Sequence, residues 1–444
     1  MKHVEQIKSF LLTFLVLLSV TLTLLIWNYK PDYELIEETE IEEVLVGERK
    51  QLQDVLKPYR VLFRENDAFT GTVSNAVINE LYSHLISMQV HDIDLINSKL
   101  SNAKMNEILR TNNRITLFFN EEIPLKVFSN VLTFYDKDIP DAAFTTLLID
   151  WSTLEEKEQL QLLFLNTEKR ILFRSYVNVE NANRFLTQII QPASEYTPYL
   201  EVERDSARSL YVVQGPVEAT KYTYLVEELS PEIFKNIVFT DPNIVVAQRK
   251  VENEQTKKYT DDTSLMTVDM KNRILNYVYP LAESIAPIPP SNLLLDSFEY
   301  VNDHGGFTAD FRLLSMNIDK HATDYQLFLQ GYPVYSKMTT TRITTTWGEN
   351  RLFRYRRPYY TIESESDIPN ERTTQKLASG EEVVEYVRNL EDYPFNKVDE
   401  IVVGYYLTQN PISYIVEPSW FAITNNVWKQ ITPEQLGGAM NGLE

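Results

Sequence analysis

The strongest constraint on this chain is an uncharged, apolar stretch near its N-terminus, from Ser9 to Tyr29. As a helix with a rise of ~1.5 Å per residue it is roughly 31 Å long, which matches the ~30 Å hydrocarbon core of a bilayer. The sequence therefore predicts a single transmembrane helix over residues 9–29, with the rest of the chain folding on one side of a membrane.

The charges that flank this stretch predict its orientation. Lys2 and Lys8 precede it, whereas residues 32–48 contain many acids and no lysine or arginine. The positive-inside rule then makes residues 1–8 a cytoplasmic stub and residues 30–43 an acidic stalk outside the cell membrane. Trp27 lies at the outer end, where aromatic rings favour the headgroup layer.

A cleaved signal peptide is the competing interpretation. It would have an apolar core of roughly 7 to 15 residues and a small-residue cleavage site. The apolar core here is longer, and Ile26 to Pro31 contains no A-x-A pattern. We therefore favour an uncleaved anchor with an extracellular C-terminal ectodomain.

Composition limits the partners and the chemistry of the ectodomain. The chain has 444 residues, which is too long for one core, so two or three domains are expected. Its 42 basic and 63 acidic residues give a net charge of −21, which repels nucleic acid, anionic headgroups and anionic wall polymers. Because cysteine is absent, there are no disulfides and no thiolate metal sites.

Apolar periodicity predicts an α+β ectodomain of short helices on antiparallel sheets. In the first part, helices are expected at residues 74–87, capped by Ser74, at a segment ending near 109, at 124–132 and at 181–190. Strands are expected at 114–120 and 143–151, with a hairpin formed by 159–165 and 170–177. The polar segment 191–198 then closes an N-terminal domain, residues 44–197.

A recurring order follows from about Tyr199, in which a short helix precedes several strands. Helices are expected to start at Ser230, to run from Ser291 to a left-handed stop at His304-Gly305-Gly306, and to span 379–390. Strands are expected within 243–279, 308–358 and 398–431. This order predicts a central domain, residues 198–288, and a C-terminal domain, residues 289–444, which form an α+β repeat.

No motif for catalysis or cofactor binding is present. The sequence lacks G-x-S-x-G, the P-loop, G-x-G-x-x-G and S-x-x-K with its partner motifs. His84 and His91 are seven residues apart, but no carboxylate stands at H-E-x-x-H spacing. We therefore expect no enzyme, no cofactor and no metal site.

An arginine cluster is the first candidate interaction surface. It consists of Arg351, Arg354, Arg356 and Arg357 in the sequence RLFRYRRPYY. On a strand, Arg354 and Arg356 share one face. Since four guanidinium groups repel one another, carboxylates are expected nearby, either on neighbouring strands, which we favour, or on an acidic partner.

Polar residues of the anchor form the second candidate surface. Small hydroxyl side chains permit close helix packing in lipid, but they also bond to their own backbone, and both interpretations stay open. The candidates for partner contact are Ser9, Thr13, Ser19, Thr23 and Trp27.

With these features, the chain resembles the YycH (WalH) family of Gram-positive bacteria. The resemblance rests on the exit WNYKPDYE from Trp27, FTDPNIV at 239–245, LFLQGYPVYS at 327–336 and IVEPSWF at 415–421. It implies a three-domain extracytoplasmic protein that modulates the sensor histidine kinase WalK (YycG) together with YycI, largely through transmembrane contacts. It also implies that the central and C-terminal domains are similar to the YycI ectodomain.

Two functions are therefore weighed. The first is a membrane-anchored regulator of a two-component kinase that controls cell-wall metabolism, with WalK and a YycI-like protein as partners and a homodimer left open. The alternative is an exported binding protein or chaperone for peptide or wall polymer, for which 26 Tyr and 21 Phe supply material for a groove.

Overall fold

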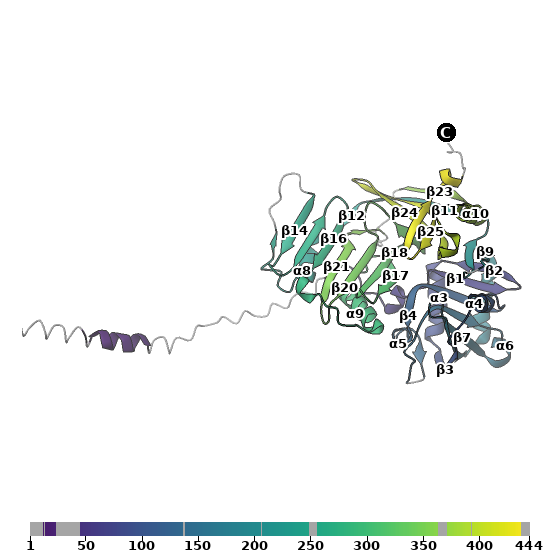
Figure 1. Ribbon diagram of the computed structural model, residues 1–444, viewed down its shortest axis with the longest axis horizontal. Coiled ribbons are helices and arrows are strands. Elements are labelled where there is room, and N and C mark those ends of the chain that lie inside the picture. Colours follow the sequence, from purple (N-terminus) through teal and green to yellow (C-terminus); the bar gives the residue numbers. More distant parts are fainter. Residues whose placement is uncertain are drawn as a thin grey trace, which may run out of the picture. The chain divides into compact units, whose positions relative to one another are not determined.

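A computed structural model of the chain describes residues 12, 14–23, 45–135, 138–205, 207–247, 255–362, 371–391 and 393–436. The chain divides into two compact units, Met1–Val44 and Leu45–Glu444. Many elements of the second unit are labelled in Figure 1.

In the first unit, residues 14–23 are helical. The hydroxyl groups of Thr21 and Thr23 donate to the carbonyl oxygens of Leu17 and Ser19, each at 2.8 Å. No helix within the described ranges is long and apolar enough to cross a membrane. The predicted anchor extends beyond those ranges, since residues 9–11, 13 and 24–29 lie outside them.

The second unit begins with a ten-stranded sheet of order β10-β9-β2-β1-β4-β6-β7-β8-β3-β5. Its strands are β1 (Arg60–Glu65), β2 (Ala68–Thr72), β3 (Gln89–Asn97), β4 (Arg114–Pro124), β5 (Thr133–Phe134), β6 (Ala143–Asp150), β7 (Gln159–Asn166), β8 (Ile171–Asn178), β9 (Thr197–Val202) and β10 (Leu210–Val213). Its helices are α2 (Leu52–Val55), α3 (Asn75–Ile86), α4 (Asn102–Leu109), α5 (Leu125–Phe128), α6 (Leu154–Lys157) and α7 (Ala182–Phe185).

Both faces of this sheet are covered, which explains why its central strands are apolar without alternation. Leu147 packs in the core that contains Ile78 and Leu81 of α3. The next residue, Leu148, points the other way, into a core with Met105 of α4. Successive side chains of a strand point to opposite faces, so a strand between two layers needs apolar residues at every position.

A fourteen-stranded sheet follows, of order β13-β14-β15-β16-β21-β20-β18-β19-β24-β25-β11-β23, with β17 beside β18 and β26 beside β25. Its strands are β11 (Pro216–Leu225), β13 (Val246–Ala247), β14 (Thr256–Thr260), β15 (Leu265–Asp269), β16 (Ile274–Val278), β17 (Asp310–Asn317), β18 (Ala322–Leu329), β19 (Tyr332–Tyr335), β20 (Arg342–Trp347), β21 (Leu352–Pro358), β23 (Glu371–Ser379), β24 (Glu400–Gln409), β25 (Ser413–Thr424) and β26 (Val427–Ile431). A small pair joins β12 (Glu227–Glu228) to β22 (Tyr360–Thr361), and the helices are α8 (Pro231–Val238), α9 (Pro290–Asp303) and α10 (Gly380–Arg388).

The α+β class with short helices is confirmed, and among the described strands every pairing is antiparallel except β3 with β5 and β19 with β24. The helix-then-strands order predicted after Tyr199 is present as α8 before β13–β16, α9 before β17–β21 and α10 before β24–β26. The expected boundary at 288–289 falls between β16 and β21, which pair with each other, so strands from both sides of it share one sheet. The division into domains stays a prediction.

The start of the second unit is fastened to the end of α9. The backbone N–H of Val46 donates to the carbonyl of His304 at 2.8 Å, and Lys50 and Asn302 exchange two hydrogen bonds of 2.7 and 2.9 Å. Gly305 has φ +64°, which confirms the predicted left-handed stop, and a Cβ there would meet the carbonyl oxygen of Gly47. The chain that follows the stalk therefore docks on α9, about 250 residues later in the sequence.

The helix ends correct several local predictions. Ser379 caps α10 in a capping box with Glu382, whereas the hydroxyls of Ser74 and Ser230 accept no capping bond, although α3 and α8 start beside them. The helix expected to start at Ser291 starts at Pro290, so Ser291 lies in its first turn. The helix predicted at 124–132 spans only Leu125–Phe128. That predicted at 181–190 is α7 followed by a π-helical turn, Leu186–Ile190.

Candidate functional site

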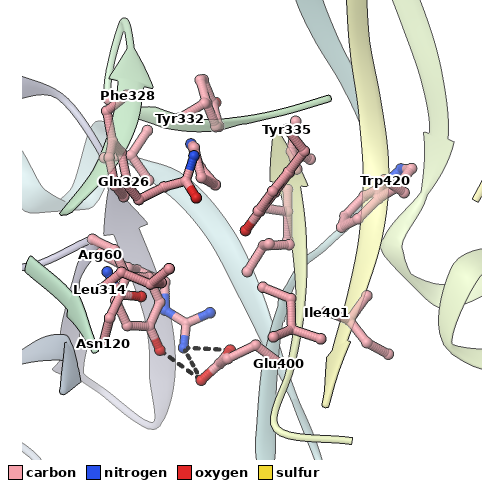
Figure 2. Close-up of a pocket in the computed structure, with 18 of the residues that line it drawn as sticks. Arg60, Asn120, Leu314, Gln326, Phe328, Tyr332, Tyr335, Glu400, Ile401 and Trp420 are labelled. Atoms are coloured by element: carbon pink, nitrogen blue, oxygen red, sulfur yellow. Dashed lines mark hydrogen bonds and ion pairs between the residues drawn. The ribbon is translucent and has the colours of Figure 1, made fainter. Parts of the chain in front are cut away.

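The two large sheets meet at a junction lined by residues of both, shown in Figure 2. From the ten-stranded sheet come Tyr59 and Arg60 at the start of β1 and Asn120 of β4. From the fourteen-stranded sheet come Gln326 of β18 and Glu400 of β24. The junction therefore joins segments that are more than 300 residues apart in sequence.

Arg60 is the centre of this junction and is 2% exposed. Its Nη2 lies 3.2 Å from Oε2 of Glu400, its Nη1 donates to the carbonyl of Tyr211 at 2.7 Å, and its guanidinium carbon lies 4.6 Å from the ring centroid of Phe118. Burial would lower the pKa of Arg60, but the Glu400 carboxylate together with Tyr59 and Tyr199 more than offsets this and raises it. Arg60 is therefore a buried cation that is held by a carboxylate of the other sheet.

Glu400 also accepts a hydrogen bond of 2.6 Å from the hydroxyl of Tyr59. Burial, and then the neighbouring carboxylate, raise the pKa of Tyr59 well above its ordinary value. Beside this group, Gln326 is fully buried, and its side chain bonds to backbone at Val334 and Thr341 and accepts from Arg342. The contacts of Glu400 therefore link the two sheets, whereas those of Gln326 lie within the fourteen-stranded sheet and the turns beside it.

Cavities of different sizes lie between the two sheets. The apolar one beside Arg60 has a volume of about 50 Å³, and an adjoining polar one, lined by Glu121, Asp399 and Trp428 among others, has about 260 Å³. Burial raises the pKa of Glu121, whose carboxylate accepts backbone N–H bonds from Glu122 and Met316. A further cavity, lined by Tyr199 and Tyr332 among others, has about 690 Å³. Since ligand pockets are usually ~300–1,000 Å³, the apolar cavity is below that range, the polar one is near its lower end and the last lies within it.

The predicted arginine cluster does not form a single surface. Arg357 is 0% exposed, donates to the carbonyls of Gly306 and Pro358, and lies 4.7 Å from the ring centroid of Phe234. Arg351 donates to the Thr240 hydroxyl at 2.6 Å. Only Arg351, Arg354 and Arg356 are exposed, so the four-member surface expected from the sequence is reduced to three.

The acids expected beside these arginines form no ion pair with them within the described ranges, although Asp324 of β18 lies in the same row of side chains as Arg356, with Thr344 between them. Among the described residues, none of Arg351, Arg354 and Arg356 forms an ion pair with a carboxylate. The predicted pairing with acids on neighbouring strands is therefore wrong for this part of the chain. Burial, and then the like charges of Arg342 and Arg354, lower the pKa of Arg356, against the opposing effect of Asp324.

The two histidines that were weighed as metal ligands line one cavity of about 750 Å³. His91 bonds to Asp92 at 2.7 Å, and His84 bonds to Gln188 at 3.1 Å. Within the described ranges no group of three or more His, Cys, Asp or Glu side chains could hold a metal ion. Of the anchor residues, Thr23 donates a hydrogen bond from its hydroxyl to the backbone carbonyl of Ser19. Ser9, Thr13 and Trp27 lie outside the described residues.

Sequence reasoning missed the junction. Its only local signal is Arg60 at the head of an apolar strand, RVLF, where a charged residue at a buried position requires a partner. The identity of that partner, Glu400, depends on the fold, because it is 340 residues away.

Comparison with known proteins covers almost the whole chain. The family described as YycH protein, N-terminal domain, matches residues 5–191, and YycH protein, C-terminal domain, matches residues 207–437. A curated relative from Bacillus subtilis (strain 168), the "Two-component system WalR/WalK regulatory protein YycH", is 22% identical over 460 residues, which cover 99% of each chain. The crystal structure of YycH from Bacillus subtilis has a TM-score of 0.75 at 20% identity, and the match covers 88% of this chain and 99% of that one.

Proposed function

Because this chain belongs to the YycH family, we propose that it is a membrane-anchored, extracytoplasmic regulator of a WalR/WalK-type two-component system that controls cell-wall metabolism. The observation that carries the proposal is the match along 99% of both chains to a relative whose name states that it regulates the WalR/WalK two-component system. A match of this extent includes every domain rather than one shared module.

The site geometry supports a regulator rather than an enzyme. The most buried charged group at the junction, Arg60, is engaged with Glu400, Tyr211 and aromatic rings, and none of these is arranged as a nucleophile with a base. The junction instead ties the two sheets together. Two sheets that are joined in this way can pass a conformational change from one sheet to the other, because packed elements move as units.

The proposed partners are the sensor kinase WalK and a YycI-like protein, which contact the predicted anchor, residues 9–29, within the membrane. Helix association in lipid gains from packing and from hydrogen bonds of roughly 0.6 to 2 kcal/mol each. Since Thr21 and Thr23 are bonded to their own backbone, close packing is the larger contribution at those positions. The contacts between the anchor and the partner helices would then depend mainly on how closely their side chains pack.

The test exchanges residues 9–29 for an unrelated span of equal length and measures expression of the kinase's target genes. We expect the exchange to reproduce the regulatory effect of deleting the whole protein. A second exchange that keeps small residues at 9, 13, 19 and 23 should retain part of the regulation. Unchanged regulation after the full exchange, with equal protein in the membrane fraction, would exclude helix pairing as the mechanism.

The second candidate is an exported binding protein for peptide or wall polymer, which the polar 260 Å³ cavity with Trp428 and Tyr335 favours. Deleting residues 1–29 would release the remainder, which can be titrated with wall fragments. Tight binding without a membrane partner, lost on Trp428→Ala, would favour this function. Absence of binding leaves the regulator as the function.

A further inference from the structure

The strands β15 and β16 alternate in burial along their whole length, and β14, β21 and β20 alternate around Tyr259, Tyr355 and Thr345. Tyr259, Met266, Tyr277 and Tyr355 are buried, and their sequence neighbours are partly or fully exposed. The registers place the buried side chains in one row, since Tyr259 pairs with Met266, Met266 with Tyr277 and Tyr277 with Tyr355. This half of the sheet therefore has one apolar face and one solvent-facing face.

Both nearby helices lie on the apolar face. Phe239, directly after α8, is in ring contact with Tyr277 at 5.5 Å, and Tyr300 of α9 is in ring contact with Tyr355 at 5.4 Å. The other face is defined by two rows of paired residues, which we call the open face. One row is Lys258, Thr267, Asn276, Arg356, Thr344 and Asp324, and the other is Leu265, Val278, Arg354 and Thr346.

The open face is rich in unneutralised positive charge. Among the described residues, neither Arg354, Arg356 nor Lys258 forms an ion pair, and Arg354 contacts only the ring of Phe353, at 5.5 Å. The carboxylate of Asp324 on this face accepts hydrogen bonds from the hydroxyls of Thr344 and Ser315. The charge of this patch is opposite in sign to the net charge of the chain, −21.

Several cations elsewhere in the second unit are paired locally. Lys104 is paired with Glu107 at 2.6 Å, and Arg110 contacts Glu201 and Glu203 at 2.8 and 2.5 Å. On the open face, Arg354, Arg356 and Lys258 have no such ion pair among the described residues, and the two nearby helices lie on the opposite face of the sheet.

We propose that the open face is a docking surface for an acidic segment of a partner protein, whose carboxylates pair with Arg354, Arg356 and Lys258. Guanidinium groups form planar paired hydrogen bonds with carboxylates. The threonine and asparagine side chains between them supply further donors and acceptors, and Leu265 and Val278 supply an apolar floor. This docking does not require the partner to be the histidine kinase.

A protein segment fits better than a charged polymer or a lipid surface. At physiological salt the Debye length is ~8 Å, so a short acidic segment senses mainly the local patch. An extended polyanion also meets the surrounding acidic surface of a chain with net charge −21 and is repelled. Arg354 and Arg356 are side-chain donors on a strand, whereas phosphate sites are commonly built from backbone N–H groups at helix N-termini.

The test uses the full chain in a nonionic detergent and a fluorescent peptide of alternating glutamate and serine, followed by anisotropy. We expect binding that weakens with salt, and about a tenfold loss of affinity in the double variant Arg354→Gln and Arg356→Gln, since exposed pairs contribute modestly each. The matched control is Lys104→Gln with Arg388→Gln, which removes the same charge from exposed, locally paired positions.

The outcomes separate the alternatives. Loss in the open-face variant with no loss in the control supports the proposal. An equal loss in both variants shows a response to net charge alone and overturns it, as does the absence of peptide binding at low salt. Binding of inorganic polyphosphate that depends on Arg354 and Arg356, with no such dependence for the peptide, would assign the face to phosphate polymers instead.

Discussion

The junction and the open face place arginine in opposite surroundings. Arg60 is almost fully buried and is held by a carboxylate, a carbonyl and aromatic rings, whereas Arg354 and Arg356 reach solvent without an ion pair among the described residues. Arg357 shows that position on the strand decides this, because it follows Arg356 directly and is buried and hydrogen-bonded. A buried cation must be satisfied by its own fold, while an exposed one is available to a partner.

This difference assigns separate roles to the two regions. The junction connects the halves of the second unit through a partly shielded ion pair, so its loss should lower the free energy of unfolding. The open face contributes little to folding, so its loss should lower the affinity for a partner. Substitutions in the two regions therefore test this difference separately.

The largest effect is expected at the junction. Arg60→Met removes the cation that pairs with Glu400, whose side chain is only 22% exposed. The substitution also removes the hydrogen bond to the carbonyl of Tyr211. We expect the free energy of unfolding to fall by about 3 kcal/mol, near the lower end for breaking a buried pair. Denaturant unfolding of the full chain in detergent measures it.

The matched control is Arg64→Met on the same strand. Arg64 pairs with Asp67, whose side chain is 83% exposed, so the loss should not exceed about 1 kcal/mol. Equal losses at both positions would mean that the ion pair across the junction does not differ from a surface pair.

A smaller, pH-dependent effect is expected from His304, behind the open face. Burial, and then the positive charge of Arg357, lower its pKa from 6.5 to about 3, and its ring lies against Tyr355. The folded state therefore binds this proton less readily than the unfolded state, so stability is present above pH ~6.5 and is lost as pH falls toward ~3. The loss approaches about 1.4 kcal/mol per pH unit.

Unfolding of the native chain and of His304→Gln between neutral pH and pH ~4 checks this. The variant should show a shallower decline of stability with falling pH, whatever its stability at pH 7. Parallel curves for the two proteins would show that His304 takes up its proton as readily in the folded state as in the unfolded state.

Local patterns in the sequence were sufficient for most of the elements. The hairpin of β7 and β8, the capping box of α10 and the stop at Gly305 each depend on residues a few positions apart. The caps expected from Ser74 and Ser230 failed, since neither hydroxyl accepts a bond from the first turn although each serine stands directly before its helix. Residue propensity predicts where a helix starts better than it predicts which atom accepts the hydrogen bonds of the first turn.

Long-range pairing could not be predicted from one sequence. The alternation of side chains along a strand correctly placed Arg354 and Arg356 on one face. Whether carboxylates lie beside them depends on which strands are the neighbours of β21. The residues that those strands place opposite the two arginines are Asn276, Val278, Thr344 and Thr346. Likewise, nothing local to Arg60 indicates Glu400. Charge balance in a sheet depends on register, which sequence distance does not encode.

The smallest effect is expected for the double variant Arg354→Gln and Arg356→Gln in the absence of a partner. Neither side chain has an ion pair among the described residues, and the like charges of Arg342 and Arg354 oppose the attraction of Asp324 for Arg356, so removing the two charges should cost little pairing energy. We expect the free energy of unfolding to change by less than about 0.5 kcal/mol, as for ordinary surface substitutions. Denaturant unfolding with an unchanged m-value checks it. A loss above about 1 kcal/mol would mean that a carboxylate of this chain neutralises the pair, in which case the open face would be part of the fold's own charge balance and no longer a docking surface.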